Sequence, residues 1–149
     1  MDKVIIVTGA SRGIGKEIAK TLSREGNIII ANYNKSEEDA RKLKEELEKE
    51  NLAIDIFKAD VSKREEAKEL VRFEKEKYKR IDVLINNAGI SENKLFTDVS
   101  DEDWNRIINT NLYSAFCMTQ EVLPNMIHNK SGNIINISSV WGMVGASCE

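Results

Sequence analysis

Residues 4–15 read VIIVTGASRGIG, in which four apolar residues lead directly into a turn that contains three glycines. The run Val4–Val7 predicts a buried strand, and the residues from Ile14 to Leu22 predict an amphipathic helix. A turn between a strand and a helix presents bare backbone N–H groups at the positive end of the helix dipole, where a phosphate can bind. Glycine is needed because a Cβ would block the close approach of the phosphate and of the crossing strand. The stretch therefore predicts a turn that binds a dinucleotide and performs no chemistry itself.

Length and composition indicate a single domain spanning residues 1–149. Hydrophobic residues make up 41% of the chain, which is enough for one buried core. The net charge of −3 argues against a general nucleic-acid binder, which would carry a basic face. No apolar run approaches the roughly 20 residues that a membrane helix needs, and no signal region precedes the first strand. We therefore expect a soluble, cytoplasmic protein that binds neither membranes nor nucleic acids.

The cysteines, the single histidine and the charge runs indicate structure rather than chemistry. Cys117 and Cys148 lie far apart without metal-ligand or CxxC spacing, so we interpret both as reduced thiols and expect no metal site. His128 is interpreted as a partner for a helix dipole. The charge runs Lys42–Glu50 and Arg72–Arg80 are interpreted as solvated helix faces.

Strand and helix patterns alternate along the chain. The predicted strands are Lys3–Val7, Ile28–Ala31, Ala53–Lys58, Ile81–Ile85 and Asn133–Ile137. Between them lie the helix after the glycine turn, a helix capped by Ser36 that ends near Glu50, a helix capped by Ser62, a short helix capped by Ser100 with Trp104 expected in the core, and a long helix from Leu112 to about Met126. This alternation predicts an α/β fold with a doubly wound, Rossmann-like parallel sheet.

Polar motifs follow several of these strands, at the edge of the sheet where ligands bind in such folds. In chain order the motifs are Thr8-Gly-x3-Gly-x-Gly, Asp60-Val61, Asn86-Asn87-Ala88-Gly89, Asn111 and Ile137-Ser138-Ser139. Together they resemble the short-chain dehydrogenase/reductase family, in particular its branch of reductases for 3-oxoacyl groups on acyl carrier protein. The resemblance covers essentially the whole chain, but only the N-terminal part of such an enzyme. It implies NADPH-dependent reduction of a 3-oxoacyl thioester, or a similar ketone, to the 3-hydroxy product.

The resemblance implies a set of cofactor-binding residues. They are Gly9, Ser11, Arg12, Gly13, Ile14, Gly15, Asn32, Asp60, Val61, Asn87, Ala88 and Gly89. In the family the aspartate contacts the adenine, and the Asn-Asn-Ala-Gly segment lines the cofactor site. The alternatives are a tight turn without a ligand for the glycines, and a carboxylate that stabilises a helix N-terminus for Asp60.

The residue expected to close the second strand favours NADP(H) over NAD(H). An acidic residue there would accept a hydrogen bond from the ribose 2′-OH of NAD and repel a 2′-phosphate. Asn32 is neutral, and Arg12 and Lys35 place positive charge nearby. The alternative is that both cations are solvated surface charges.

Two residues are candidates for catalysis by the resemblance. The hydroxyl of Ser139 would hydrogen-bond the substrate carbonyl and polarise it, whereas Ser138 is interpreted as structural. Asn111 lies within a predicted helix, where a polar amide has no helical reason to be buried; in the family it bends the helix and holds a water in a proton relay. The alternative for Asn111 is a solvent-exposed surface residue.

The family's proton donor, the tyrosine of a Tyr-x-x-x-Lys motif, is expected beyond Glu149. Tyr33, Tyr78 and Tyr113 lie in the wrong segments to replace it. We therefore expect the sheet to be truncated after its fifth strand and these 149 residues alone to be inactive. The alternative function is a non-catalytic NAD(P)-binding fragment or remnant.

The long helix from Leu112 to Met126 suggests a homo-oligomer. Ala115, Met118, Val122 and Met126 make it apolar beyond a single stripe. The alternative is that another part of the same chain covers this face.

Overall fold

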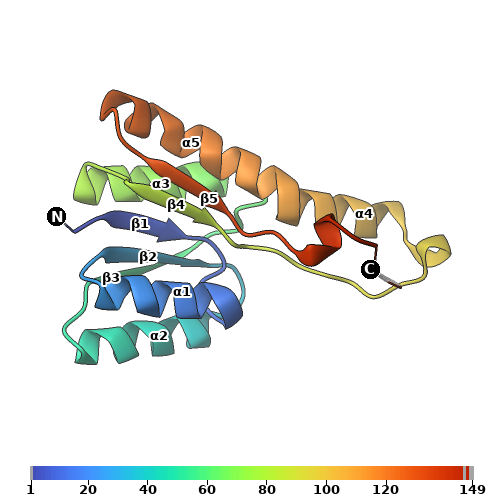
Figure 1. The fold of residues 1–149 in the computed structure, drawn as a ribbon, viewed down its shortest axis with the longest axis horizontal. Helices are drawn as coiled ribbons and strands as arrows, with labels where there is room; N and C mark the ends of the chain where they lie inside the picture. The colour runs from blue at the N-terminus through green and yellow to red at the C-terminus, as the bar shows by residue number, and fades with distance from the viewer. Residues whose placement is uncertain (1, 146, 148–149) are drawn as a thin grey trace.

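Five parallel strands form one sheet in the order β3-β2-β1-β4-β5 (Figure 1). The computed structural model describes residues 2–145 and 147. The strands are β1 (Val4–Val7), β2 (Ile28–Tyr33), β3 (Ile54–Lys58), β4 (Val83–Asn86) and β5 (Asn133–Asn136). The chain builds outward from β1 to β3, then returns to the other side of β1 with β4 and β5. This reversal confirms the doubly wound fold, and it places the topological switch point between β1 and β4.

Helices cover both faces of the sheet. Figure 1 shows α1 (Gly13–Arg24) and α2 (Glu37–Lys49) on one side and α3 (Arg64–Tyr78) and α5 (Ser114–His128) on the other. The helix α4 (Asp101–Ile108) continues into α5 through a π-helical turn, η2 (Asn109–Tyr113), and two short 3₁₀ turns are η1 (Phe96–Asp98) and η3 (Val140–Gly142). The covered sheet explains why its strands read as continuous apolar runs.

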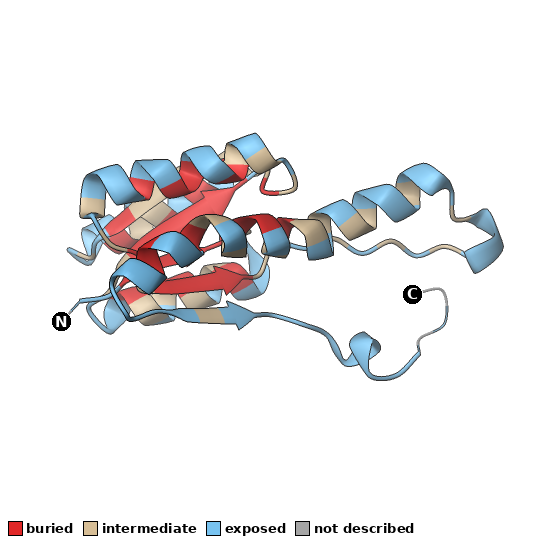
Figure 2. Ribbon diagram, turned by 90° about the horizontal axis from the view of Figure 1, so that it is seen from above, coloured by how far each residue is buried: buried red, intermediate tan, exposed pale blue. Residues whose placement is uncertain are grey.

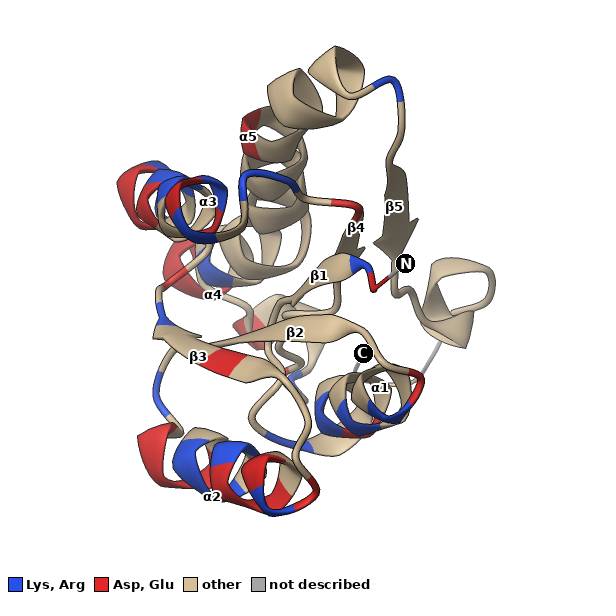
Figure 3. Cartoon of the chain, turned by 90° about the vertical axis from the view of Figure 1, so that its left-hand side faces the viewer, with Lys and Arg blue, Asp and Glu red and all other residues tan. Residues whose placement is uncertain are grey.

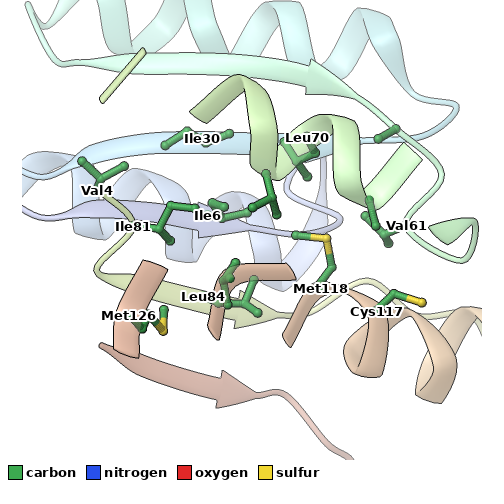
Figure 4. Close-up of a cluster of buried hydrophobic side chains, with 14 residues drawn as sticks. Val4, Ile6, Ile30, Val61, Leu70, Ile81, Leu84, Cys117, Met118 and Met126 are labelled. Carbon is green, nitrogen blue, oxygen red and sulfur yellow. The ribbon is translucent and has the colours of Figure 1, made fainter. Parts of the chain in front are cut away.

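Successive residues of the inner strands face opposite sides of the sheet and form two core layers. Ile6 and Leu84 point toward α3 and α5, where Met118 packs against them (Figure 4). Val7 and Ile85 belong to the layer shared with α1 and α2. Figure 2 shows the central strands buried, whereas β5 and the segments beyond it are mostly exposed. The alternation follows from the two-residue repeat of a strand.

Of the three serines expected to cap helices, only Ser100 does so. Its Oγ accepts from Asp103 N at 3.2 Å, and the Asp103 carboxylate accepts from Ser100 N at 3.1 Å, which completes a capping box. The prediction for Ser62 is wrong, because its hydroxyl donates to Asp60 Oδ1 at 2.6 Å and α3 begins downstream of it. Ser36 precedes α2 without a side-chain hydrogen bond to any described backbone group of that helix.

The apolar residues of α5 belong to the core of this same chain. Met118 and Val122 are fully buried and Met126 is 5% exposed. The prediction that these residues form a subunit interface is therefore wrong, because the sheet of the same chain covers them. The expectation for Trp104 is also wrong: it is 58% exposed, because α4 extends past the sheet (Figure 2).

Glu74 is a fully buried carboxyl group on α3. Neither of its oxygens has a hydrogen-bond partner among the described residues. Burial, together with the nearby carboxylate of Asp55, raises the pKa of Glu74 from its usual 4.5 to about 8. The folded protein therefore holds a proton on Glu74 at neutral pH, whereas the unfolded chain releases it.

This proton makes stability fall as the pH rises. Between pH 4.5 and 8 the folded state keeps the proton that the unfolded state has lost, which lowers the free energy of unfolding by up to about 5 kcal/mol across that interval. Glu74→Gln should remove this slope, as measured by urea unfolding at a series of pH values. The control is Glu76→Gln, on the exposed face of the same helix. An unchanged slope in Glu74→Gln would contradict the assignment.

Candidate functional site

The turns that follow β1 and β4 are locked together by two side chains. Thr8 Oγ1 accepts hydrogen bonds from Asn87 N at 3.0 Å and Ala88 N at 2.9 Å, and donates to Ile85 O at 3.4 Å. The Asn87 amide nitrogen donates to Thr8 O at 2.9 Å and to Gly9 O at 3.2 Å. The glycine turn and the Asn87–Gly89 segment therefore form one rigid edge at the topological switch point.

Two of the three glycines in the turn serve different purposes. A Cβ on Gly15 would lie 2.4 Å from Asn87 Nδ2 and 2.5 Å from Gly9 O, so this position has no room for a side chain. Gly13 has φ +56° and open space around it, with no heavy atom within 4 Å of the Cβ position. Gly15 therefore allows the turns to interlock, and Gly13 keeps the entry to α1 accessible to a ligand.

The N-terminus of α1 is free to receive an anion. No side chain of the described residues caps it, and its first turn contains no acidic residue, whereas α2, α3 and α4 each carry acids there. Ser11 is buried within the turn, while Arg12, Gly13 and Ile14 are exposed beside the helix start. A phosphate fits this position, because it would satisfy first-turn N–H groups at the positive end of the dipole.

Asn32 supports the glycine turn from within the sheet. It is 2% exposed, its Oδ1 accepts from Gly9 N at 3.3 Å, and its Nδ2 donates to Ala59 O at 3.0 Å. The side chain is therefore engaged by the protein itself. Through its bond to Gly9 N it helps to position the turn, and the first exposed side chains after β2 are Asn34 and Lys35.

Asp60 and Val61 lie beyond the end of β3, on the same edge. Asp60 Oδ1 accepts from the amide and the hydroxyl of Ser62, at 3.1 and 2.6 Å, and Asp60 N donates to Glu66 Oε2 at 2.6 Å. The Glu66 bond to this amide, followed by its bond to Lys63, lowers the pKa of Glu66. Val61 is buried in the core. Asp60 is held in place by these bonds and remains partly exposed at the edge.

Asn111 joins the π-helical turn to the loop that follows Gly89. Its Oδ1 accepts from Ile90 N and its Nδ2 donates to Ile90 O, both at 2.8 Å. Asn111 lies in the middle of η2, where the helix departs from α geometry, and such turns occur frequently at functional sites. The amide therefore fixes the path of the chain directly after the Asn87–Gly89 segment.

Ser138 and Ser139 leave the sheet next to this segment. Ile137 N donates to Asn86 O at 2.9 Å, which extends the β4–β5 pairing up to the serines. Ser139 is exposed, and its Oγ accepts from Trp141 N at 3.3 Å as it begins η3. A hydroxyl that accepts one hydrogen bond still has a proton to donate, which is what polarising a carbonyl requires.

Arg12 and Lys35 are the cations beside the glycine turn. Neither has a carboxylate within 4.0 Å among residues 2–145 and 147. By contrast, the nearby cations Lys16, Lys20 and Arg24 of α1 pair with acids on α2. The positive charge of Arg12 and Lys35 is therefore available to a ligand.

The loop that leads to α4 is fixed by an ion-pair cluster. Lys94 Nζ lies 2.6 Å from Asp103 Oδ2, and Arg106 forms an ion pair with Glu92. The Lys94 hydrogen bond, followed by those from Ser100, holds the pKa of Asp103 well below its usual range. This cluster holds the segment after Ile90 against α4.

Sequence reasoning located the glycine turn, the Asn87–Gly89 segment and the serines, and the structure brings these to one edge. It did not assign a role to Thr8, Ile90 or Glu66. For Thr8 a signal was present, since a hydroxyl directly after a buried strand can hydrogen-bond the neighbouring turn. No signal in the sequence pairs Ile90 with Asn111 or Glu66 with the Asp60 amide, because both contacts depend on how the loops close.

Metal-binding clusters and membrane spans are absent from the part of the chain that the structure describes. No group of three or more His, Cys, Asp or Glu residues there could hold a metal ion. No helix there is long and apolar enough to cross a bilayer. Cys117 is a buried free thiol, and Cys148 lies outside the described residues.

Comparison with known proteins identifies relatives along nearly the whole chain. The family model described as short chain dehydrogenase matches residues 3–149. The chain is 38% identical over 145 residues to the 3-oxoacyl-[acyl-carrier-protein] reductase of Staphylococcus epidermidis, covering 97% of this chain and 59% of that protein. It is 41% identical over 143 residues to the protein of the same name from Thermotoga maritima, covering 96% of this chain and 58% of that protein. The chain thus spans less than two thirds of the length of these relatives.

Gly13→Ala tests whether the open space at the start of α1 receives the ligand. The matched control is Gly26→Ala, which also has positive φ and open surroundings but lies at the far end of α1. Each change should cost roughly 1–2 kcal/mol of stability through backbone strain. Only Gly13→Ala should weaken the binding of a nicotinamide dinucleotide, by about tenfold or more in calorimetric titration, because its methyl group would occupy the position expected for a phosphate. Equal affinities of the two variants would contradict the assignment.

Proposed function

Because the chain belongs to the short-chain dehydrogenase family, we propose that it forms the nucleotide-binding part of an NADPH-dependent reductase acting on 3-oxoacyl thioesters or similar ketones. The observation that carries this proposal is the interlocked edge at β1 and β4, with the uncapped N-terminus of α1 beside it. The names of the two relatives, both 3-oxoacyl-[acyl-carrier-protein] reductases, support a 3-oxoacyl group on an acyl carrier protein as the substrate.

The cofactor would lie along the carboxyl edge of the sheet. Gly13, Ile14 and Gly15 would receive its phosphates at the start of α1. Asp60 would contact the adenine at one end. Asn87–Gly89 would line the nicotinamide half. Bound there, the cofactor supplies the hydride that reduces the substrate carbonyl.

The charges around the turn favour NADP(H). Asn32 places no acid beside the ribose, and the exposed side chains that follow β2 are Asn34 and Lys35. Arg12, at the start of α1, has no carboxylate partner within 4.0 Å among the described residues. A guanidinium can bind a 2′-phosphate through two charge-assisted hydrogen bonds. Arg12 and Lys35 would therefore bind the group that distinguishes NADP from NAD.

Arg12→Gln tests this assignment. The substitution should weaken NADPH binding by about tenfold, because a charge-assisted hydrogen bond is worth about 1.5–3 kcal/mol, and should change NADH binding little. Lys58→Gln, an exposed cation at the end of β3, is the control. Calorimetric titration with NADPH and with NADH gives the ratio of the two dissociation constants for each variant. Tighter binding of NADH than of NADPH by the unaltered chain would overturn the NADP assignment.

Within the proposed reaction, Ser139 and Asn111 act on the substrate side. Ser139 would donate its proton to the ketone oxygen and so polarise the carbonyl that accepts hydride. Asn111 would position the loop at Ile90 and, through the departure of η2 from α geometry, take part in the family's proton relay. Both roles rest on the family resemblance, supported by the exposed hydroxyl and by the clamp on Ile90.

A second reading is a nucleotide-binding chain that does not turn over by itself. It is favoured by the positions of the tyrosines within the described residues. Tyr33 is buried in β2, Tyr78 donates to Asp55 on the far side of the molecule from the turn, and Tyr113 packs against Phe116 and beneath Arg64. None is placed as a proton donor beside Ser139, so protonation of the reduced ketone would need a group beyond those described.

The two readings differ in turnover. The 149-residue polypeptide should bind NADPH yet fail to oxidise it with an acetoacetyl thioester, because a missing general acid is typically worth about 10²–10⁴-fold in rate. Absorbance at the NADPH band measures this directly. Turnover by the verified polypeptide that disappears in Ser139→Ala would show instead that these residues suffice for catalysis.

We also propose self-association through the outer face of α5. Phe116, Leu123 and Ile127 of α5, together with Leu112 of η2, are exposed at spacings that place them on one stripe. An exposed apolar stripe of this length is typical of a helix that packs against a partner. The proposed interface therefore consists of this exposed stripe and not of the buried residues on which the sequence-based prediction rests.

A further inference from the structure

A row of cations follows one side of α3. Arg64, Lys68, Arg72 and Lys75 recur at intervals of three or four residues, which places them on one face of the helix. Lys79 continues the row at the C-cap. The row is about 20 Å long at the rise of an α-helix. Glu65 and Glu69 lie on the adjacent face, and Glu76 lies at the border of the row, where it pairs with Arg72.

The row borders a groove between α3 and α5. The groove has a volume of about 390 Å³ and is lined by Lys68, Val71, Arg72, Lys75, Glu76, Lys79 and Glu121. Arg64, at the start of α3, reaches across to α5: it donates to Gln120 Oε1 at 2.6 Å, lies 3.7 Å from the Glu121 carboxylate and lies 5.3 Å from the centre of the Phe116 ring. Figure 3 shows the charged α3 beside α5, which is almost free of charge. The groove therefore has one strongly basic wall.

The row combines three lysines without an acidic partner among the described residues and two arginines that each have one. Lys68, Lys75 and Lys79 have no carboxylate within 4.0 Å, whereas Arg64 lies 3.7 Å from Glu121 and Arg72 lies 3.9 Å from Glu76. On α1 and α2, by contrast, most cations form ion pairs within and between the helices; these are Lys16, Lys20, Arg24, Arg41, Lys42 and Lys44. Although the chain has a net charge of −3, three lysines of the groove therefore have no carboxylate at ion-pair distance among the described residues.

We propose that this basic groove is a docking surface for an acidic amphipathic helix of a partner protein. Its cations are spaced by single helical turns, so they match carboxylates at i, i+4, i+7 and i+11 of a helix laid along the groove. A compact phosphate fits poorly, because the backbone N–H groups on the flank of α3 are used within the helix. Nucleic acid fits poorly too, since the groove lining has no aromatic side chain on which bases could stack.

The surface is separate from the nucleotide site. Figure 1 shows α3 and α5 on the face of the sheet opposite to α1, whose N-terminus receives the proposed phosphate. Docking at the groove therefore does not require NADPH binding or turnover. Either proposal can fail while the other stands.

The test measures binding of a fluorescein-labelled helical peptide with glutamates at i, i+4, i+7 and i+11 of one face. Fluorescence anisotropy should show binding that weakens as salt is raised. The twin peptide with glutamines at these positions should not bind. Lys68→Glu/Lys75→Glu/Lys79→Glu should lower the affinity about tenfold or more, since three attractive contacts become repulsive.

A matched control keeps the net charge equal. Lys3→Glu/Lys49→Glu/Lys58→Glu alters three exposed lysines outside the groove and should bind the peptide within about twofold of the unaltered chain. Lys68→Gln/Lys75→Gln/Lys79→Gln, with circular dichroism, shows that any loss does not come from unfolding of α3. Equal loss in the control, no preference for the glutamate peptide, or stronger competition by a single-stranded oligonucleotide of equal charge would each overturn the proposal.

Discussion

The hydrogen bonds between Thr8 and Asn87 are the constraint on which the rest of the site depends. They join the turns after β1 and β4, which are 79 residues apart in sequence, into one edge. Gly15 lacks a side chain because Asn87 occupies the space a Cβ would need. Removing one partner of a buried hydrogen bond lowers the stability by about 1–3 kcal/mol. A substitution of Thr8 or of Asn87 would therefore leave the other residue without its partner, at this cost. The interlock fixes where α1 begins, and with it the position that we propose for the phosphate.

The parallel sheet brings further site residues to the edge formed by these two turns. Because β1 and β4 are neighbours at the switch point, the segments that follow β2, β3 and β5 are carried to the same edge. Asn32 then supports Gly9, Asp60 is held by Ser62, and Ser139 emerges beside Asn86. The uncapped start of α1 is consistent with this arrangement, since a side-chain cap would compete with the ligand for the same N–H groups.

Much of the fold and site could be predicted from sequence, because strand runs and glycine spacing are local signals. The apolar runs located all five strands to within a few residues, and the motif order located the edge. The prediction that Ser62 caps α3 was wrong because Asp60, two residues earlier, accepts a hydrogen bond from its hydroxyl. The prediction of a subunit interface at Met118 and Val122 was wrong because an apolar residue in a sequence does not reveal whether its own sheet or a second subunit covers it. The burial of Glu74 was not predicted, because it lies within a run of charged residues. Its spacing from Leu70 and Val71 nevertheless places it on the buried face of α3.

Above all, we propose that the interlocked edge receives the nucleotide. Titrating the ¹⁵N-labelled chain with NADPH and following the backbone amide signals tests it most directly. The largest shifts should fall on Gly13, Ile14 and Gly15 and on Asn87–Gly89, with Asp60 and Val61 also affected, while the amides of α3 beyond its first turn stay unchanged. Shifts centred on any other surface, or none at saturating NADPH, would contradict the claim.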